Sequence, residues 1–437
     1  MTNRSSIALG FFALILVGAI LLASPWARAA GTWGGAMQAF FTACSAVCVT
    51  GLTIVNVATE YTRAGQVVLL ALVEIGCLGL MTCGTFLLIA IGRRLSLVRE
   101  FSLMNAYGVA QVQGLKGLIC WVIGSTLVIE AAGACLLFWR WHDWYQAVFF
   151  SIMGFCNAGF SLRADSVAAF AGDPYVILTL AAETILGGIG FLVIYNLCTF
   201  KFLRRRSGGK GRLSLHTAVV LRFTFYLLAI ALAAVLVIEW NGTLRSYAGW
   251  QKLWVAFYQA MTPRTCGFCI IPTEALHPLT RHVYEILMFI GGAPGSAAAG
   301  IKVTTLAVLI CTLRALCRNE DETIISRKSV PDDIVRESIV IVMALMVFVC
   351  VVYGALLVTE RTTGISESAL LFEAVSAVTT TGLSVGDTTV RLSVAGKMVI
   401  MVAMFLGRLG ALTVVLMIGD RESNRHVRFP TEELVVG

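Results

Sequence analysis

The chain has 437 residues, of which 58% are apolar and 13% are charged, and it carries a net charge of +8. Its mean hydropathy is +0.84. Soluble proteins carry roughly 25% charged residues, so this composition excludes an ordinary soluble enzyme or binding module and indicates a polytopic membrane protein.

Apolar runs of about 18 to 25 residues, long enough to cross a bilayer, occur eight times. The first resembles a secretion signal because Ala27-Arg28-Ala29 follows it, but it is long enough to span, and we expect it to remain uncleaved. An even number of spans places both termini on one side of the membrane. The predicted spans are residues 6–25, 67–91, 117–139, 175–200, 217–239, 282–315, 337–358 and 394–418.

The distribution of Lys and Arg predicts on which side of the membrane the termini lie. These residues are concentrated in the links after the second, fourth and sixth spans and in the tail, so both termini and these links are expected in the cytoplasm. Each basic cluster is short and adjoins a spanning helix, so nucleic acid is not an expected partner. The clusters are Arg93, Arg94 and Arg99, then Lys201, Arg204, Arg205, Arg206, Lys210 and Arg212, then Arg314, Arg318, Arg327 and Lys328, and finally Arg421, Arg425 and Arg428.

A shorter segment lies between the two spans of each pair, at residues 35–50, 143–157, 249–265 and 367–380. These segments are too brief to cross a bilayer, and their apolar residues recur at helical spacing. They could be surface loops, but the apolar spacing favours re-entrant helices. Non-helical backbone at their ends is tolerated at membrane depth where it lines a water-filled cavity.

Each short segment ends in a similar motif, a small or polar pair followed by glycine and a large apolar residue. The glycines Gly51, Gly159, Gly267 and Gly382 lie 108, 108 and 115 residues apart, which indicates one module used four times. The predicted fold is an all-α membrane protein with four pseudo-symmetric repeats of helix, re-entrant pore loop and helix around a central pore. The predicted repeats occupy residues 1–100, 101–212, 213–328 and 329–437.

The motifs predict a cation filter. Glycine lets successive carbonyls turn toward an axis, and rings of carbonyl oxygens replace the water around a cation. The negative C-terminal ends of the short helices favour a cation too. None of the motifs contains Asp or Glu, which argues against a carboxylate ring for a divalent ion. The predicted filter residues are Val49, Thr50, Gly51, Asn157, Ala158, Gly159, Thr265, Cys266, Gly267, Thr380, Thr381 and Gly382.

Two further features suggest a gate. Glycines and a proline interrupt the sixth span between Gly291 and Gly300, where a continuous helix is disfavoured. Arg408 is a charge inside the eighth span, which is a functional-site hypothesis by default, with a packing ion pair as the alternative. The acidic residues in or near spans could form ion routes or pair with Arg408 or Arg264; they are Glu74, Glu130 and Glu183.

The chain resembles the Trk/Ktr/HKT superfamily of potassium transporters over essentially its full length, and most closely the bacterial Ktr-type membrane subunit. The similarity rests on the four glycine motifs and on further matches. These are Pro294-Gly295-Ser296, Gly300-Ile301-Lys302, Gly407-Arg408-Leu409-Gly410, and Phe429-Pro430 through Val435-Val436-Gly437.

The resemblance implies a selectivity filter with one glycine from each repeat. A serine at the first position accompanies sodium transport in this superfamily, so Gly51 implies potassium. The resemblance also implies an intramembrane gating loop at residues 291–305, with Arg408 just below the filter as an electrostatic barrier. The implied gate residues are Gly291, Gly292, Gly295, Ser296, Gly300, Lys302 and Arg408.

The sequence departs from the family pattern at two places. Ala297, Ala298 and Ala299 stand where glycines and a threonine are usual, and Glu74 stands where glutamine is usual. Alanine has the higher helix propensity, so we expect a stiffer loop.

The implied partners are a second copy, giving a homodimer with one pore per protomer, and a separate cytoplasmic nucleotide-binding (RCK-type) ring. The basic links at 204–212 and 314–328 could dock that ring or bind anionic membrane lipid. No covalent cofactor is expected, and sodium dependence stays open. The predicted function is potassium uptake across a bacterial cell membrane. The main alternative is a coupled potassium/sodium or potassium/proton symporter; an enzyme is not expected, since no catalytic cluster is present.

Overall fold

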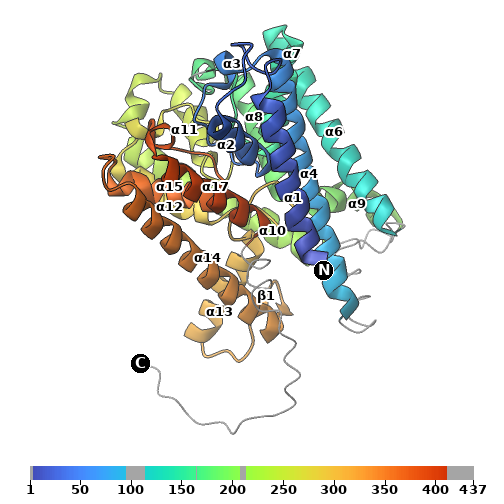
Figure 1. The fold of residues 1–437 in the computed structure, drawn as a ribbon. Coiled ribbons are helices and arrows are strands. Elements are labelled where there is room, and N and C mark those ends of the chain that lie inside the picture. Colours follow the sequence, from blue (N-terminus) through green and yellow to red (C-terminus); the bar gives the residue numbers. More distant parts are fainter. Residues whose placement is uncertain (1–2, 95–113, 164, 207–212, 411–437) are drawn as a thin grey trace, which may run out of the picture.

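The computed structural model describes residues 3–94, 114–163, 165–206 and 213–410 (Figure 1). Several predictions fall outside these ranges: basic residues Arg99, Lys210 and Arg212, the end of the eighth span, and the tail with its match at 429–437. The described part is almost entirely helical. Its two short strands, β1 (Ile324–Ile325) and β2 (Lys328–Ser329), form an antiparallel hairpin in which Ile324 faces Ser329.

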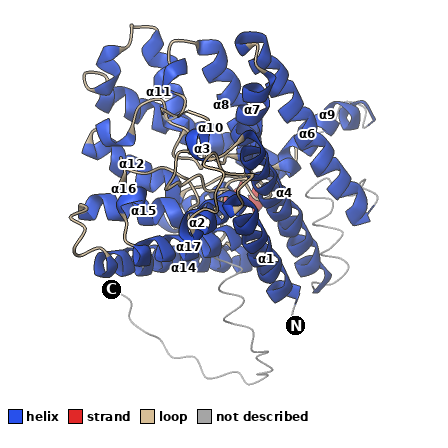
Figure 2. Cartoon of the chain, turned by 45° about the horizontal axis from the view of Figure 1, so that its top comes forward, coloured by secondary structure: helices blue, strands red, loops and turns tan. Residues whose placement is uncertain are grey.

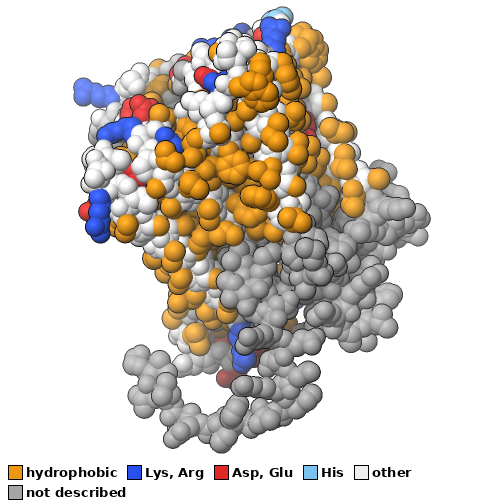
Figure 3. All heavy atoms as spheres, in the orientation of Figure 1, with side chains coloured by type: hydrophobic (Ala, Val, Ile, Leu, Met, Phe, Trp, Pro, Cys, Tyr) orange, Lys and Arg blue, Asp and Glu red, His pale blue; other side chains and the backbone are white. Residues whose placement is uncertain are grey.

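Long helices form the outside of the molecule, and loops lie near its centre (Figure 2). Apolar side chains cover much of the described face in Figure 3. Three described stretches are apolar and long enough to cross a membrane, namely Ile119–Trp141, Leu215–Glu239 and Asp332–Thr359. The long helices are α1 (Asn3–Ala23), α4 (Arg63–Arg94), α6 (Gly114–Trp141), α10 (Leu215–Glu239) and α14 (Asp332–Thr359).

Four short helices fall where the sequence predicts re-entrant segments. They are α2 (Ala36–Val47), α7 (Trp144–Cys156), α11 (Gln251–Met261) and α15 (Glu367–Val378). Two begin at side-chain caps: the Asp143 carboxylate accepts from the amides of Tyr145 and Gln146, and the Ser366 hydroxyl accepts from that of Ala369. Each short helix contributes an aromatic ring that is at most 1% exposed, from Phe41, Phe149, Tyr258 and Phe372. The short helices therefore form the core.

Three of the four short helices pack against the longer helix that follows them: α2 contacts α4, α7 contacts α8, and α15 contacts α17. The fourth, α11, contacts α10 and α8, which precede it. The helices not yet placed are α8 (Pro174–Ile189), α9 (Phe191–Arg206), α12 (Pro278–Phe289), α13 (Val303–Cys317) and α17 (Val394–Leu409). One-turn elements connect them: α3 (Val57–Glu60), α16 (Thr388–Arg391), η2 (Ala168–Phe170), η3 (Thr243–Ser246) and η4 (Thr273–Ala275).

Two predicted spans are broken. The sixth divides into α12 and α13, as the glycines and proline at 291–300 predict. The fourth, predicted as one span over 175–200, was wrong as a continuous helix: α8 and α9 meet at Gly190 with a bend of 100°. Gly190 has φ +81, outside the helical region, and the next amide, that of Phe191, donates to the Gly295 carbonyl rather than continuing the helix.

Candidate functional site

The same backbone conformation recurs after each of the four short helices. Each glycine of the repeated motif has positive φ, and so does the residue two places before it. A non-glycine residue with positive φ is uncommon and marks a locally constrained backbone. The pairs are Val49 (53°) with Gly51 (93°), Asn157 (57°) with Gly159 (68°), Thr265 (65°) with Gly267 (74°), and Thr380 (48°) with Gly382 (84°).

The residue between each pair is tied back to its own short helix. Its amide donates to a carbonyl four or five residues earlier, so the backbone turns sharply at the helix end. The bonds are Thr50 to Ser45 (2.8 Å), Ala158 to Met153 (3.0 Å), Cys266 to Thr262 (3.2 Å) and Thr381 to Ser376 (2.8 Å). The four tips are thus fixed mainly by backbone hydrogen bonds.

The four tips meet in a closed order. A β-carbon added to Gly51 would lie 2.2 Å from the Ala158 carbonyl oxygen of the second motif. A β-carbon added to Gly159 would lie 3.4 Å from Cys266 O, and one added to Gly267 would lie 3.1 Å from Thr381 O. One added to Gly382 would lie 1.9 Å from Thr50 O, back in the first motif. Each glycine therefore admits a carbonyl of the next motif, and the fourth motif closes on the first. We call this arrangement the carbonyl ring.

Several polar side chains at the ring are buried without a partner among the described residues. They include the hydroxyls of Thr50 and Thr380 and both amide atoms of Asn157, which is 1% exposed. Buried polar groups in proteins are almost always hydrogen-bonded. Their presence beside four converging carbonyls makes the ring a polar region within an apolar core.

Glycines in the following helices let those helices approach the ring. A β-carbon on Gly76 of α4 would lie 2.1 Å from Val47 O, and one on Gly187 of α8 would lie 1.9 Å from Phe155 O. A β-carbon on Gly407 of α17 would likewise lie 2.0 Å from Val378 O. Since backbone meets backbone at these places, any side chain there would push the helix away from the tip. The Gly187-Gly188-Ile189-Gly190 run thus serves close packing at its first glycine, as its composition suggests.

The segment between α12 and α13, residues 290–302, forms a loop closed at its base. Gly291 N donates to Ile301 O (3.0 Å), Ile301 N to Phe289 O (3.0 Å) and Val303 N to Gly292 O (3.0 Å). The body of the loop docks on the break between α8 and α9: Ala293 N donates to Gly188 O (2.9 Å), and Ala297 N to Gly187 O (3.1 Å). This loop contains all the predicted gate residues except Arg408. Ala297, Ala298 and Ala299 of this loop are not helical.

Three cationic side chains hold carbonyls of this loop. Arg408 Nη1 lies 2.5 Å from Ala297 O, Lys302 Nζ lies 2.6 Å from Ala298 O, and Arg264 Nη2 lies 3.3 Å from Gly291 O. Arg408 is 2% exposed, and its Nε and Nη2 lack partners among the described residues. The predicted alternative for Arg408, an ion pair with another helix, does not occur within the described ranges.

The three acidic residues are also not placed as predicted. Glu74 and Glu130 lie beside Cys156, and Glu183 accepts a hydrogen bond from Ser151. Within the described residues none of them forms an ion pair with Arg408 or Arg264, so the pairing hypothesis was wrong there. The acidic residues lie on α4, α6 and α8, whereas each of the two arginines donates to a loop carbonyl.

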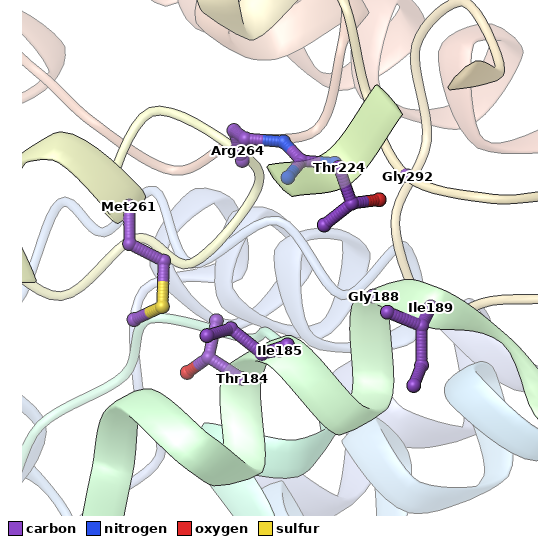
Figure 4. A pocket seen from close by; sticks show the side chains of 8 residues that line it. All are labelled: Thr184, Ile185, Gly188, Ile189, Thr224, Met261, Arg264 and Gly292. Atoms are coloured by element: carbon purple, nitrogen blue, oxygen red, sulfur yellow. The ribbon is translucent and has the colours of Figure 1, made fainter. Parts of the chain in front are cut away.

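A small cavity of about 20 Å³ lies beside the loop (Figure 4). Met261 lines it from the end of α11, Thr224 from α10 and Gly292 from the loop, and Arg264 lines it just before the third motif. Helix α8 supplies the remaining lining residues, Thr184, Ile185, Gly188 and Ile189. A volume of this size holds about one water molecule. Arg264 therefore connects the third motif, the cavity and the base of the loop.

The structure thus brings the predicted filter residues together as one group and the predicted gate residues as a second. Arg264 directly precedes the predicted filter residue Thr265, but it is not among the predicted gate residues. Its partner is a main-chain carbonyl 27 residues away, which leaves no mark in the sequence. The only available signal was a buried charge beside a filter glycine.

Comparison with known proteins identifies the family. The model of the family described as TrkH, cation transport protein, matches residues 19–426. The chain belongs to the TrkH family of cation transport proteins. It is therefore a multi-pass protein of the bacterial cell membrane, in a family of ion transporters rather than enzymes.

Relatives of this TrkH-family chain match it along nearly its whole length. It is 34% identical to the Ktr system potassium uptake protein B of Bacillus subtilis, covering 100% of this chain and 97% of the relative. It is 32% identical to the potassium/sodium uptake protein NtpJ of Enterococcus hirae, covering 99% and 96%. The structure of the potassium transporter TrkH from Vibrio parahaemolyticus matches with a TM-score of 0.73 at 18% identity, covering 96% and 85%, which supports the fold alone.

Proposed function

We propose that this protein mediates potassium uptake, with the carbonyl ring as its selectivity filter. The observation that carries the proposal is the closed order of contacts, in which each motif glycine faces a carbonyl of the next motif. Relatives named for potassium uptake over the full length support the choice of ion. Gly51 rather than serine at the first motif supports potassium over sodium.

The ring has the chemistry that a dehydrated cation needs. Carbonyl oxygens of Thr50, Ala158, Cys266 and Thr381 would replace water around the ion. The C-terminal ends of α2, α7, α11 and α15 lie next to these carbonyls and add negative potential. No carboxylate belongs to the motifs, so a monovalent cation can bind without being held too tightly to leave.

The loop at 290–302 is proposed as the gate. It is anchored at its base by backbone bonds and on its body by Arg408 and Lys302, so opening must break charge-assisted hydrogen bonds to Ala297 and Ala298. The charge of Arg408 would in addition repel potassium in the closed state. The hydrogen bonds from Arg408 and Lys302 to the loop can be replaced by bonds to water without unfolding a helix. A gate requires such a low-cost change.

The remaining parts of the proposal concern assembly. Four pseudo-symmetric repeats would surround one pore, with both termini in the cytoplasm. Two copies would form a homodimer, and a cytoplasmic nucleotide-binding ring would regulate the gate. Names of relatives as parts of a Ktr system support a separate partner. The hairpin β1–β2 and the basic link at 314–328 are the proposed docking region, with anionic lipid as a second ligand of the same charges.

The test is cation flux into proteoliposomes, comparing potassium with sodium for the native protein and for Gly51→Ser. Gly51 has φ +93 and faces Ala158 O, so serine must alter the ring; we expect potassium flux to fall relative to sodium flux. Gly124→Ser is the matched control, because a β-carbon there meets nothing within 4 Å. Selectivity that is indifferent to Gly51 would overturn the proposed filter. Strict dependence of potassium flux on a second ion would favour the coupled symporter instead.

A further inference from the structure

A mixed cluster of carboxylates and a thiol lies directly behind the second motif. Cys156 is the last residue of α7 and precedes the filter residue Asn157. Its Sγ lies 3.3 Å from Glu74 Oε2 of α4 and 3.8 Å from Glu130 Oε1 of α6. One ligand atom from each of these three residues lies within 4.8 Å of the other two. Three separate helices thus present metal-ligand groups to one point.

Further ligand groups lie around this cluster. The Cys77 thiol, one turn after Glu74 on α4, is fully buried and adjoins Cys156. Glu183 is 3% exposed, and its Oε2 has no partner among the described residues. Ser151 connects Glu183 with Glu130, donating from Oγ to Glu183 and lying 2.7 Å from the Glu130 carbonyl oxygen.

The cluster therefore has more acceptors than donors. Glu74 Oε1 is also buried without a partner, and within the described ranges no Lys or Arg forms an ion pair with any of these carboxylates. Buried carboxylates are costly unless they are paired or coordinate a metal. The buried cations Arg408 and Arg264 bond to the loop carbonyls instead.

We propose that Glu74, Glu130 and Cys156 form a binding site for a borderline-soft divalent cation of the Zn²⁺ type, with Cys77 in reach as a fourth ligand. Zinc binds thiolate sulfur at about 2.3 Å and carboxylate oxygen at about 2.0–2.2 Å. Tetrahedral geometry then separates neighbouring ligand atoms by roughly 3.3–3.8 Å, which matches the sulfur–oxygen distances here. Thiol donors select such metals over magnesium or calcium, which take oxygen ligands.

Binding at this site would join α4, α6 and the end of α7. The junction lies one residue before Asn157, whose positive φ helps to form the second tip. A bound divalent cation would therefore hold this tip in place independently of potassium.

The experiment is a cadmium titration of the purified full-length protein in a non-thiol reductant. Cadmium serves as the probe because its bonds to thiolates give an ultraviolet charge-transfer band. Exposed cysteines, which include Cys120, Cys135, Cys198, Cys317 and Cys350, are first blocked with N-ethylmaleimide. We expect the native protein to bind cadmium at a buried thiol site, and excess zinc to displace it.

Cys156→Ser and Glu74→Gln test the ligands by two different routes. We expect Cys156→Ser, which leaves only the Cys77 thiol at the site, to weaken the band strongly. We expect Glu74→Gln, which keeps both thiols and the side-chain shape, to lower the cadmium affinity by about tenfold or more, equivalent to about 1.4 kcal/mol. Cys135→Ser on α6 is the control and should bind like the native protein. Absence of the band in the native protein, or the same affinity in Glu74→Gln, would overturn the proposal.

Discussion

The carbonyl ring and the loop at 290–302 lie next to each other but are held in different ways. At the ring, each tip is fixed by an amide that donates back to its own short helix, and glycine backbones face carbonyls across the centre. The loop is also closed by backbone bonds at its base and by Lys302 within it, but its body is held in addition by the Arg408 side chain from α17 and by backbone bonds to α8. The ring tips are therefore fixed by their own short helices, whereas the loop also depends on contacts with other helices.

Selectivity and opening can therefore reside in different regions. A ring whose glycines have no space for a β-carbon cannot shift without changing all four tips, which suits a fixed coordination geometry. A loop whose carbonyls bind Arg408 and Lys302 can exchange those donors for water.

The largest effect is expected from Gly382→Ala at the ring. Its new β-carbon would lie 1.9 Å from Thr50 O, and positive φ alone costs a non-glycine residue about 1–2 kcal/mol. We expect potassium flux in proteoliposomes to fall by about tenfold or more, since 1.4 kcal/mol corresponds to tenfold. Gly124→Ala, at a position with nothing within 4 Å, should retain native flux. Native flux in Gly382→Ala would show that the ring can move.

The second prediction compares two adjacent glycines of α8. A β-carbon at Gly187 would lie 1.9 Å from Phe155 O, whereas one at Gly188 would meet only Asn157 Nδ2 at 3.8 Å. Overpacking costs about 1–3 kcal/mol, so Gly187→Ala should lower the thermal unfolding midpoint by several degrees, and Gly188→Ala should not. Equal midpoints for the two variants would contradict the close packing of α8 on the second tip.

The sequence predicted both regions because their signals are local. Glycine recurrence located Gly51, Gly159, Gly267 and Gly382, and Pro294 with its glycine neighbours located the break in the sixth span. The bend at Gly190 was missed because the Gly295 carbonyl, far along the chain, accepts from Phe191 N at the bend. The positions of the carboxylates were also missed, because pairing between helices depends on which faces meet.

The third prediction concerns the hydrogen bond that Arg408 of α17 makes to the loop. Arg408→Gln removes a charge and its bond to Ala297 O, and hydrogen bonds to charged groups contribute about 1.5–3 kcal/mol. We expect potassium flux in the absence of any cytoplasmic partner to rise several-fold. Arg361→Gln, at an exposed position, is the charge-matched control and should leave flux unchanged. A fall in flux for Arg408→Gln would mean that the arginine supports conduction instead of closing the pore.

The smallest effect is expected within the loop backbone itself. Ala297, Ala298 and Ala299 are buried and non-helical. Compared with glycine, alanine therefore acts here only by restricting the backbone conformations of the loop. Replacing all three with glycine raises the conformational entropy that the closed loop must lose, so flux should rise modestly in the same assay. Ala275→Gly, at an exposed position in η4, controls for added glycine elsewhere. If the triple variant has native flux and gating, Arg408 and Lys302 hold the closed loop irrespective of its backbone stiffness, and the alanines do not set the gate.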